Sequence, residues 1–280
     1  MPHVVVGGGA VYYQDLGPDR GEGEPVILAH SSTMSGAQWR SLAEILVSRH
    51  RLLIPDLWGY GDSDPWPGPG PLTLAGEAAI IFEMMRLAGA PAHLVGHSYG
   101  GAACLHAALA EPDRVASLVA YEPVAFHFLD RSDAGDAAAH DEITCVADRI
   151  SGYVMAGDME GSMEFFVDYW NGPGAWRRLS DETRVELAGR APKVVHEFAA
   201  ILDDDVDLAD PAQFDRPVLL LSGERSPSPA GHVTARLAKT LTAARLETVA
   251  DASHMGPVTH RDPVNRLIVD YLSALAKGQK

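Results

Sequence analysis

The sequence has few basic side chains. Of its 280 residues, 22 are lysine or arginine against 38 aspartates and glutamates, so the formal net charge is −16. Nucleic acids and anionic membranes are bound through clustered lysine and arginine, which neutralise phosphate groups. We therefore expect a partner that is neither a nucleic acid nor a membrane surface.

Cysteine, metal-ligand motifs and long apolar stretches are also scarce or missing. The two cysteines, Cys104 and Cys145, are too few for a disulfide framework or a structural zinc site. No H-E-x-x-H or similar ligand spacing occurs, and no stretch approaches the ~18–20 apolar residues that cross a bilayer. The first residues carry neither a basic leader nor a long apolar segment. We expect a cytoplasmic protein that needs no metal or other cofactor, and we leave its oligomeric state open, a homo-oligomer included.

The sequence does contain a regular alternation of two patterns. Short apolar runs typical of strands occur at residues 4–6, 11–13, 26–29, 52–54, 93–95, 115–121, 217–221 and 245–249. Helical spacing appears at residues 39–48, 75–87, 101–110 and near 233–241. Asp262 as N-cap and Pro263 as first helical residue predict the start of a last helix. The alternation predicts an α/β fold whose central sheet is mostly parallel and flanked by helices.

The alternation stops between residues 126 and 210. Apolar residues in this stretch recur at helical spacing, and no segment has a convincing strand pattern. We therefore predict one α/β core formed by residues 1–125 and 211–280. An all-helical lid at residues 126–210 is inserted into this core.

A G-x-S-x-G motif, GHSYG, occupies residues 96–100. The pentapeptide alone is a weak signal, but it directly follows the expected strand at 93–95 and directly precedes a helix. Glycines on both sides permit the strained turn on which a nucleophilic serine is held. Ser98 is therefore the candidate nucleophile.

A serine hydroxyl needs a base to act as a nucleophile. His254 lies in the loop between the last expected strand and the last helix, at the same edge of the sheet as Ser98. It also comes late in the chain, as the order serine, acid, histidine requires. Structural roles suit the competing histidines, His30, His97, His106 and His260.

Four segments together resemble the α/β-hydrolase superfamily over nearly the whole chain. They are residues 30–32 (HSS), 56–63 (DLWGYGDS), the GHSYG motif and residues 253–257 (SHMGP). The resemblance implies that the 56–63 loop shapes the sheet edge without a catalytic role. It also implies that the backbone amides of Ser32 and Tyr99 form the oxyanion hole, although Ser31 replaces the glycine of the family's H-G-x motif.

The acid that orients His254 departs from the usual family pattern. Most members carry an aspartate in a G-x-x-D turn after the strand that follows the lid, and this chain has Ser226 there. Glu122 directly follows the strand at 115–121, at the edge where active sites of open α/β sheets lie. Some haloalkane dehalogenases, members of the same superfamily, place their acid after the corresponding strand. We therefore predict Glu122 as the acid, with Glu224 and Asp251 as alternatives.

These residues predict a serine hydrolase that cleaves the carboxylic ester of a small apolar substrate through an acyl-enzyme. Within this superfamily, a serine nucleophile argues against epoxide hydrolase and dehalogenase chemistry, which use a carboxylate. A C–C bond hydrolase, perhydrolase, lyase or acyltransferase would use nearly the same residues. A non-catalytic ligand-binding protein of this fold could also retain them.

The lid segment is rich in aromatic and methionine side chains. We expect some of them to face Ser98 and to form an apolar acyl pocket. The candidates are Phe128, Met155, Met163, Phe165, Phe166, Tyr169, Trp170 and Trp176.

Overall fold

One eight-stranded sheet organises the protein, whose computed structural model describes residues 2–18, 23–202 and 211–278. The strands are β1 (His3–Val6), β2 (Gly9–Leu16), β3 (Val26–Ala29), β4 (Leu52–Pro55), β5 (Ala92–His97), β6 (Val115–Tyr121), β7 (Val218–Gly223) and β8 (Ala244–Val249). Their spatial order is β1-β2-β4-β3-β5-β6-β7-β8. Strands β1 and β2 pair antiparallel, as do β2 and β4, and every pair from β4 to β8 is parallel. The predicted mostly parallel sheet is confirmed.

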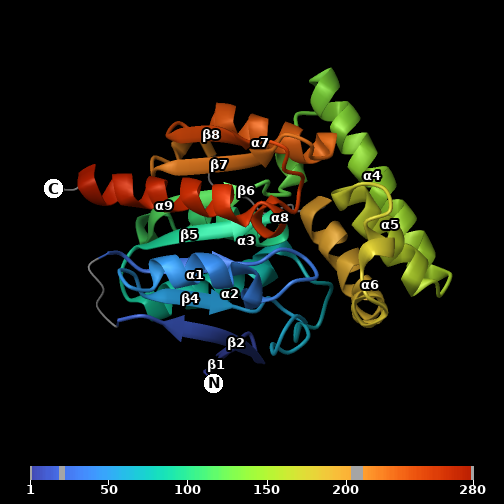
Figure 1. Ribbon diagram of the computed structural model, residues 1–280, viewed down its shortest axis with the longest axis horizontal. Coiled ribbons are helices and arrows are strands. Elements are labelled where there is room, and N and C mark those ends of the chain that lie inside the picture. The colour runs from blue at the N-terminus through green and yellow to red at the C-terminus, as the bar shows by residue number, and fades with distance from the viewer. Residues whose placement is uncertain (1, 19–22, 203–210, 279–280) are drawn as a thin grey trace.

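Helices cover both faces of this sheet. Successive side chains of a strand point to opposite faces, and in the central strands both sets are apolar and must be buried. On β3, Val26 and Leu28 pack in one core with α1 (Arg40–Leu46) and α9 (Arg261–Gly278), which Figure 1 shows in front of the sheet. Ile27 and Ala29 belong to the opposite core, together with α2 (Leu74–Ala88), α3 (Ser98–Ala110) and α7 (Ser228–Thr240). Burial on both faces explains why the central strands have continuous apolar sequences.

Shorter helical segments connect these elements. They are η1 (Gly36–Trp39), η2 (Pro112–Arg114), η3 (Phe126–Phe128), η4 (Trp176–Arg178), η5 (Pro211–Gln213) and α8 (Gly256–Thr259). Within the described ranges, no helix is both long enough and apolar enough to cross a membrane.

A helical insertion separates β6 from β7. It contains α4 (Ala134–Met155), α5 (Met159–Asn171) and α6 (Asp181–Leu202), and the described residues 126–202 include no strand. Figure 1 shows the three helices stacked beside one end of the sheet. The helical insertion predicted from the sequence is therefore present, and its predicted end at residue 210 lies outside the described residues.

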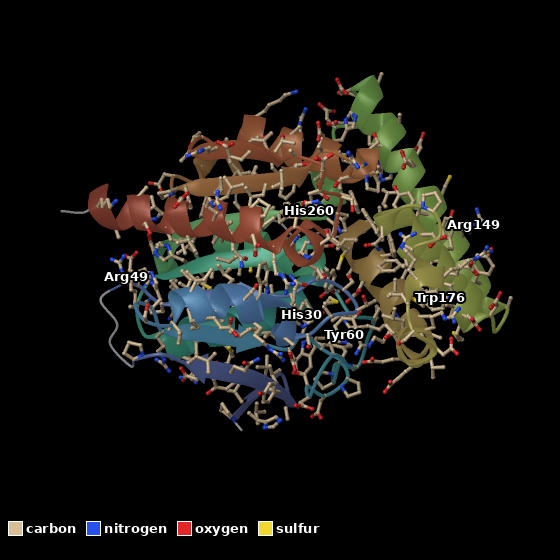
Figure 2. All side chains as sticks on the ribbon, in the orientation of Figure 1. His30, Arg49, Tyr60, Arg149, Trp176 and His260 are labelled. Carbon is tan, nitrogen blue, oxygen red and sulfur yellow. The ribbon has the colours of Figure 1, made fainter. Side chains whose placement is uncertain are left out.

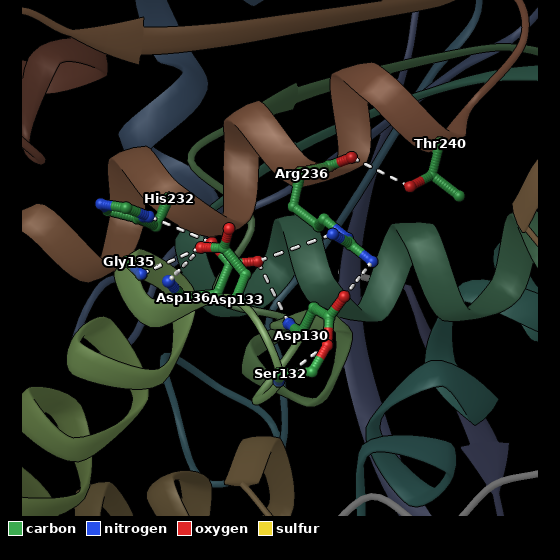
Figure 3. Close-up of polar contacts among 8 residues, drawn as sticks. All are labelled: Asp130, Ser132, Asp133, Gly135, Asp136, His232, Arg236 and Thr240. Atoms are coloured by element: carbon green, nitrogen blue, oxygen red, sulfur yellow. Dashed lines mark hydrogen bonds and ion pairs between the residues drawn. The ribbon is translucent and has the colours of Figure 1, made fainter.

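Polar contacts join α4 of the insertion to α7 of the core (Figure 3). Asp133 caps α4, because its carboxylate accepts hydrogen bonds from the first-turn amides, including that of Asp136 at 3.0 Å. The Asp136 carboxylate in turn lies 3.1 Å from His232 Nδ1 on α7. Arg236, one turn further along α7, lies 3.1 Å from Asp130. These contacts hold the start of the insertion against the core.

Three helices begin two or more residues away from the predicted start. Helix α3 begins at Ser98 rather than at residue 101, and α7 begins at Ser228, five residues earlier than predicted. Glycine and proline in these first turns obscure the helical spacing of apolar residues. Helix α9 begins at Arg261, because α8 has already turned the backbone just before it. Asp262 therefore lies in the first turn of α9, and its prediction as N-cap is wrong.

The two cysteines lie in different environments. Cys104 on α3 is buried, and burial raises the pKa of its thiol far above the ordinary value. Cys145 on α4 is exposed. Neither is part of a disulfide.

Candidate active site

Ser98 occupies a tight turn between β5 and α3, with a positive φ of 53°. Side chains would not fit on either side of it. A Cβ at Gly96 would lie 2.6 Å from the carbonyl oxygen of Gly100, and a Cβ at Gly100 would lie 2.3 Å from that of His30. The two glycines therefore permit the close backbone approach that a strand–turn–helix serine requires.

His254 approaches Ser98 from the loop that follows β8. Its Nε2 atom lies 2.8 Å from Ser98 Oγ. Two buried groups fix this loop: His97 Nε2 donates to the His254 carbonyl oxygen at 2.8 Å, and the Tyr121 hydroxyl donates to the carbonyl oxygen of Ser253 at 2.7 Å. Burial lowers the pKa of His97 well below its ordinary value, so this ring stays neutral and acts as a fixed donor.

Glu122 contacts the other nitrogen of the same imidazole. Its Oε2 atom lies 2.6 Å from His254 Nδ1, and the side chain is fully buried. Its Oε1 atom accepts two further hydrogen bonds, from the Gly223 amide at 2.7 Å and the Ser222 hydroxyl at 3.0 Å. These three hydrogen bonds hold the buried carboxylate in one orientation.

The alternative acids lie elsewhere. Glu224 is exposed and its carboxylate accepts a hydrogen bond from the Asp251 amide at 2.9 Å. The Asp251 carboxylate is also exposed and forms an ion pair with Arg225. Ser226, at the usual family position of the acid, has a buried hydroxyl without a hydrogen-bond partner among the described residues. The structure thus brings Glu122, and neither alternative, into contact with His254.

Of the two residues predicted for the oxyanion hole, Tyr99 directly follows Ser98 in the chain and Ser32 lies on another loop. Tyr99 is the second residue of α3, where backbone amides have no partner within the helix. Ser32 lines the same cavity as Ser98. The turn that carries Ser32 is held by Ser31, whose amide and hydroxyl both donate to Gln38 Oε1 at 3.0 Å. Serine in place of the family's glycine therefore adds a side-chain hydrogen bond that fixes this turn.

His30 anchors the beginning of the same turn. Its Nδ1 atom donates to the Ser31 carbonyl oxygen at 2.8 Å, and its Nε2 atom accepts from the Leu57 amide at 2.9 Å. Burial lowers the pKa of His30 to about 3, so the ring stays neutral, as these two hydrogen bonds require. Figure 2 shows His30 beside Tyr60, whose ring packs edge-on against it at 5.7 Å between centroids. The expected structural role of His30 is consistent with these contacts.

A cavity of about 480 Å³ opens over Ser98 and His254. Apolar side chains from the insertion form much of its wall: Phe166, Val167, Trp170, Leu179 and Leu187. Of the aromatic and methionine side chains predicted as pocket candidates, Phe166 and Trp170 thus line the cavity. Met163 and Trp176 pack instead in the hydrophobic core, and Met155 is exposed.

Trp170 has a contact that the sequence did not suggest. Its ring packs on the His254 imidazole, with 4.1 Å between centroids and 32° between the ring planes. Trp170 is almost fully buried, so it keeps water away from one face of the imidazole. In the sequence it belongs to a helical stripe of apolar residues, which is equally compatible with a role in helix packing.

A buried ionic network joins the insertion to the core beside Ser98. Lys193 Nζ on α6 lies 3.0 Å from Glu197 Oε1 on the same helix and 3.1 Å from Glu77 Oε2 on α2. Glu77 is fully buried and also accepts a hydrogen bond from the Trp58 amide at 2.8 Å. The ammonium lies 5.1 Å from the ring centroid of Tyr99, the residue after Ser98.

The pKa shifts in this network reflect its burial and its charges. Burial acts to lower the pKa of Lys193, but the two carboxylates outweigh it and hold that pKa above the ordinary value. Burial raises the pKa of Glu77, although Lys193 opposes this shift. Lys193 is therefore charged and compensates two carboxylates that are both removed from water.

Replacing Lys193 should destabilise the fold strongly. Lys193→Met leaves two buried carboxylates without a counter-charge, so we expect the free energy of unfolding to fall by about 3–5 kcal/mol in denaturant titrations at neutral pH. The exposed Lys239→Met variant on α7 is the control and should change it by less than about 0.5 kcal/mol. The loss should shrink as pH falls, because the folded variant can take up a proton on Glu77, whose pKa is raised by burial. Equal losses for the two variants would contradict this role of Lys193.

Within residues 2–18, 23–202 and 211–278, no three histidine, cysteine, aspartate or glutamate side chains gather as ligands. The polar groups at the site are instead a hydroxyl, an imidazole and a carboxylate in series, which can move a proton between Ser98 and His254.

Known proteins share this fold and, in part, this sequence. A model of the α/β hydrolase fold family matches residues 24–142. The chain is 26% identical to a putative non-heme chloroperoxidase from Synechocystis over 97% of this chain and 100% of that protein. It is 29% identical to a pimeloyl-[acyl-carrier protein] methyl ester esterase from Methylococcus capsulatus, over 91% and 96% of the two chains. It is also 37% identical to the lipase LipV from Mycobacterium tuberculosis, but that match spans 40% of each protein.

A solved structure agrees over almost the full length. The crystal structure of a hydrolase from Pseudomonas aeruginosa is 25% identical and superposes with a TM-score of 0.75, covering 97% of each chain. The parallel sheet, the serine turn after β5 and the helical insertion between β6 and β7 are in keeping with these similarities. The chain thus has the α/β-hydrolase fold, and the proteins to which it is similar include esterases and other hydrolases.

Proposed function

We propose that this protein hydrolyses carboxylic esters through an acyl-enzyme formed on Ser98. The observation that carries the proposal is a continuous series of short contacts. Ser98 Oγ lies 2.8 Å from His254 Nε2, and His254 Nδ1 lies 2.6 Å from Glu122 Oε2. This is the arrangement in which a histidine can take a serine proton while a carboxylate stabilises the resulting imidazolium.

Acylation follows from this geometry. Ser98 Oγ forms a bond to the ester carbonyl carbon as its proton passes to His254 Nε2. Glu122 keeps the Nδ1 proton directed toward itself and balances the positive charge of the imidazolium. The bond from the carbonyl carbon to the alcohol oxygen then breaks, and the Nε2 proton passes to that leaving oxygen.

The developing negative charge needs donors fixed in advance. In our proposal the amides of Ser32 and Tyr99 donate to the carbonyl oxygen as it becomes an oxyanion. The hydrogen bonds from Ser31 to Gln38 and the helical position of Tyr99 support this role, because they hold both segments before substrate arrives. Removal of one such donor typically costs about 10²–10³ in kcat.

Deacylation uses the same groups with water as the nucleophile. His254 takes a proton from water, whose oxygen bonds to the acyl carbon, and the bond from that carbon to Ser98 Oγ breaks. The proton returns to Ser98, and the carboxylic acid leaves. The proposed steps use only these side chains, the two backbone amides and water.

The apolar wall of the cavity supports an apolar acyl or alcohol group in the substrate. Phe166, Val167, Trp170, Leu179 and Leu187 lie on the insertion side of a cavity that also contains Ser98 and His254. Burial of such a group against these side chains contributes binding energy in proportion to the area removed from water. Relatives that are named esterases add support for an ester as the substrate class.

Covalent labelling tests this proposal directly. The purified protein should react with a fluorophosphonate, give one adduct on the peptide that contains Ser98, and hydrolyse short p-nitrophenyl esters. Labelling and loss of ester hydrolysis should proceed in parallel, because both depend on one hydroxyl. Ester hydrolysis that survives complete labelling would contradict the proposal. Labelling of a protein that turns over no ester would favour another chemistry of the same residues, such as C–C bond hydrolysis.

A further inference from the structure

Three of the described side chains that line the cavity over Ser98 carry a formal charge. They are Arg178, Glu186 and Arg190, all from the insertion, and the other lining residues are polar or apolar. An apolar cavity with a few charged groups binds ligands whose charges match those groups. The partners of each charged side chain therefore indicate what the cavity can bind.

Glu186 and Arg190 form an ion pair with each other. They are four residues apart on α6, and Arg190 Nη2 lies 2.5 Å from Glu186 Oε1. Arg190 also donates from Nη1 to the carbonyl oxygen of Thr33, on the loop that carries Ser32. This arginine thus has a structural task that links α6 to the core, and the pair adds no net charge to the cavity.

Arg178 differs from Arg190, because no ion pair or hydrogen bond of its side chain is found among the described residues. It is exposed at the end of η4, and no carboxylate lies within ion-pair distance of it among the described residues. Its neighbour Arg177 is also exposed, but it pairs with Glu164 at 3.7 Å and does not line the cavity. As far as the described residues show, Arg178 is therefore a positive charge in the cavity wall without an ion-pair partner.

The guanidinium group of Arg178 is thus an anion-binding group in the cavity wall of a protein whose formal net charge is −16. The guanidinium group offers a planar fork of N–H donors, which matches the two oxygens of a carboxylate. We propose that Arg178 binds a carboxylate on the substrate, so that the natural substrate is an ester with an apolar middle and an anionic far end. This inference rests on the proposed ester hydrolysis.

Binding of a substrate carboxylate by Arg178 should change KM rather than kcat. The carboxylate would lie away from the reacting carbonyl, so its contact with Arg178 is the same in the bound ester and in the transition state. Such uniform binding lowers KM and leaves kcat nearly unchanged. The preference for an anionic ester should therefore be a KM effect that weakens as salt screens the charge.

The experiment compares matched esters in three proteins: the native chain, Arg178→Gln and Arg177→Gln. One arm places the carboxylate on the acyl side, with mono-p-nitrophenyl glutarate against p-nitrophenyl valerate. The other arm places it on the alcohol side, with the butyrate ester of 4-hydroxybenzoate against phenyl butyrate. The measured quantity is the ratio of kcat/KM for the anionic ester to that for the neutral ester. Intrinsic differences in ester reactivity cancel when this ratio is compared between proteins.

In one arm, Arg178→Gln should lower the ratio by about five- to twentyfold, through KM, and Arg177→Gln should leave it unchanged. Raising the ionic strength from about 0.02 M to 0.5 M should lower the ratio for the native chain but not for Arg178→Gln. The arm that responds identifies the side of the ester that carries the carboxylate.

An unchanged ratio in both arms, or an equal fall for Arg177→Gln, would overturn the role of Arg178. Turnover of the neutral esters is measured in the same assays, so these outcomes would leave the proposed ester hydrolysis standing. If no ester of either kind is hydrolysed, the proposed function itself is wrong, and this inference fails with it.

Discussion

Ser98→Ala is expected to lower kcat for ester hydrolysis by about 10⁴- to 10⁶-fold, with no loss of folded structure. The substitution removes the oxygen that would form the acyl-enzyme, while the turn between β5 and α3 remains compatible with a small side chain. Activity is measured with p-nitrophenyl butyrate, and folding is checked by thermal unfolding. The activity that remains should come only from substrate binding and from stabilisation of the oxyanion by the two backbone amides.

Ser226→Ala is a matched control for this variant. It also removes a buried hydroxyl, at the position where most family members have their acid, but Ser226 Oγ has no partner among the described residues. We expect Ser226→Ala to keep kcat within about twofold of the native value. Removal of a hydroxyl that has no hydrogen-bond partner leaves no neighbouring group unsatisfied. If Ser98→Ala retained more than a few per cent of native activity, the serine mechanism would be wrong.

The second large effect is expected for Glu122→Gln, which should lower kcat by about 10²–10⁴-fold with little change in KM. The amide keeps the size of the carboxylate, and its oxygen can still accept from the Gly223 amide and the Ser222 hydroxyl. Its NH₂ group would then face His254 Nδ1, which disfavours the tautomer that accepts a proton at Nε2. The variant also removes the negative charge that balances the imidazolium.

Glu224→Gln serves as the comparison, because Glu224 was an alternative acid and is exposed. Its activity should stay within about tenfold of the native value, since an exposed carboxylate has little effect on charge at a distance. A harmless Glu122→Gln together with a crippled Glu224→Gln would assign the acid to the turn after β7. Both variants are compared at saturating and at low concentrations of one ester, so that kcat and KM are separated.

Much of the core could be predicted because its strands are buried on both faces. The apolar run predicted as a strand at residues 115–121 coincides with β6. Ser98 and His254 could be proposed because Ser98 directly follows a strand, His254 lies in the loop after the last strand, and the carboxyl ends of parallel strands meet at one edge of the sheet. Glu122 could be predicted as the acid only after it was clear that Ser226 occupies the position of the usual aspartate.

Other features depend on contacts that leave no local pattern. The stripe that contains Phe166 and Trp170 has the same spacing whether it faces other helices or a cavity, so the packing of Trp170 on His254 could not be predicted. The Glu77–Lys193 ion pair joins residues 116 positions apart, and nothing near either residue indicates the other. The start of α3 at Ser98 was missed because the glycines that permit the turn also weaken the helical pattern.

The unequal exposure of the two cysteines gives the insertion a natural attachment point for a probe. Cys104 is enclosed in the core and its thiol resists ionisation, whereas Cys145 faces solvent on α4. A maleimide dye added to the native chain would therefore mark the insertion alone, without any engineered cysteine. Changes in the emission of that dye on addition of substrate would report whether α4 moves relative to its surroundings during turnover.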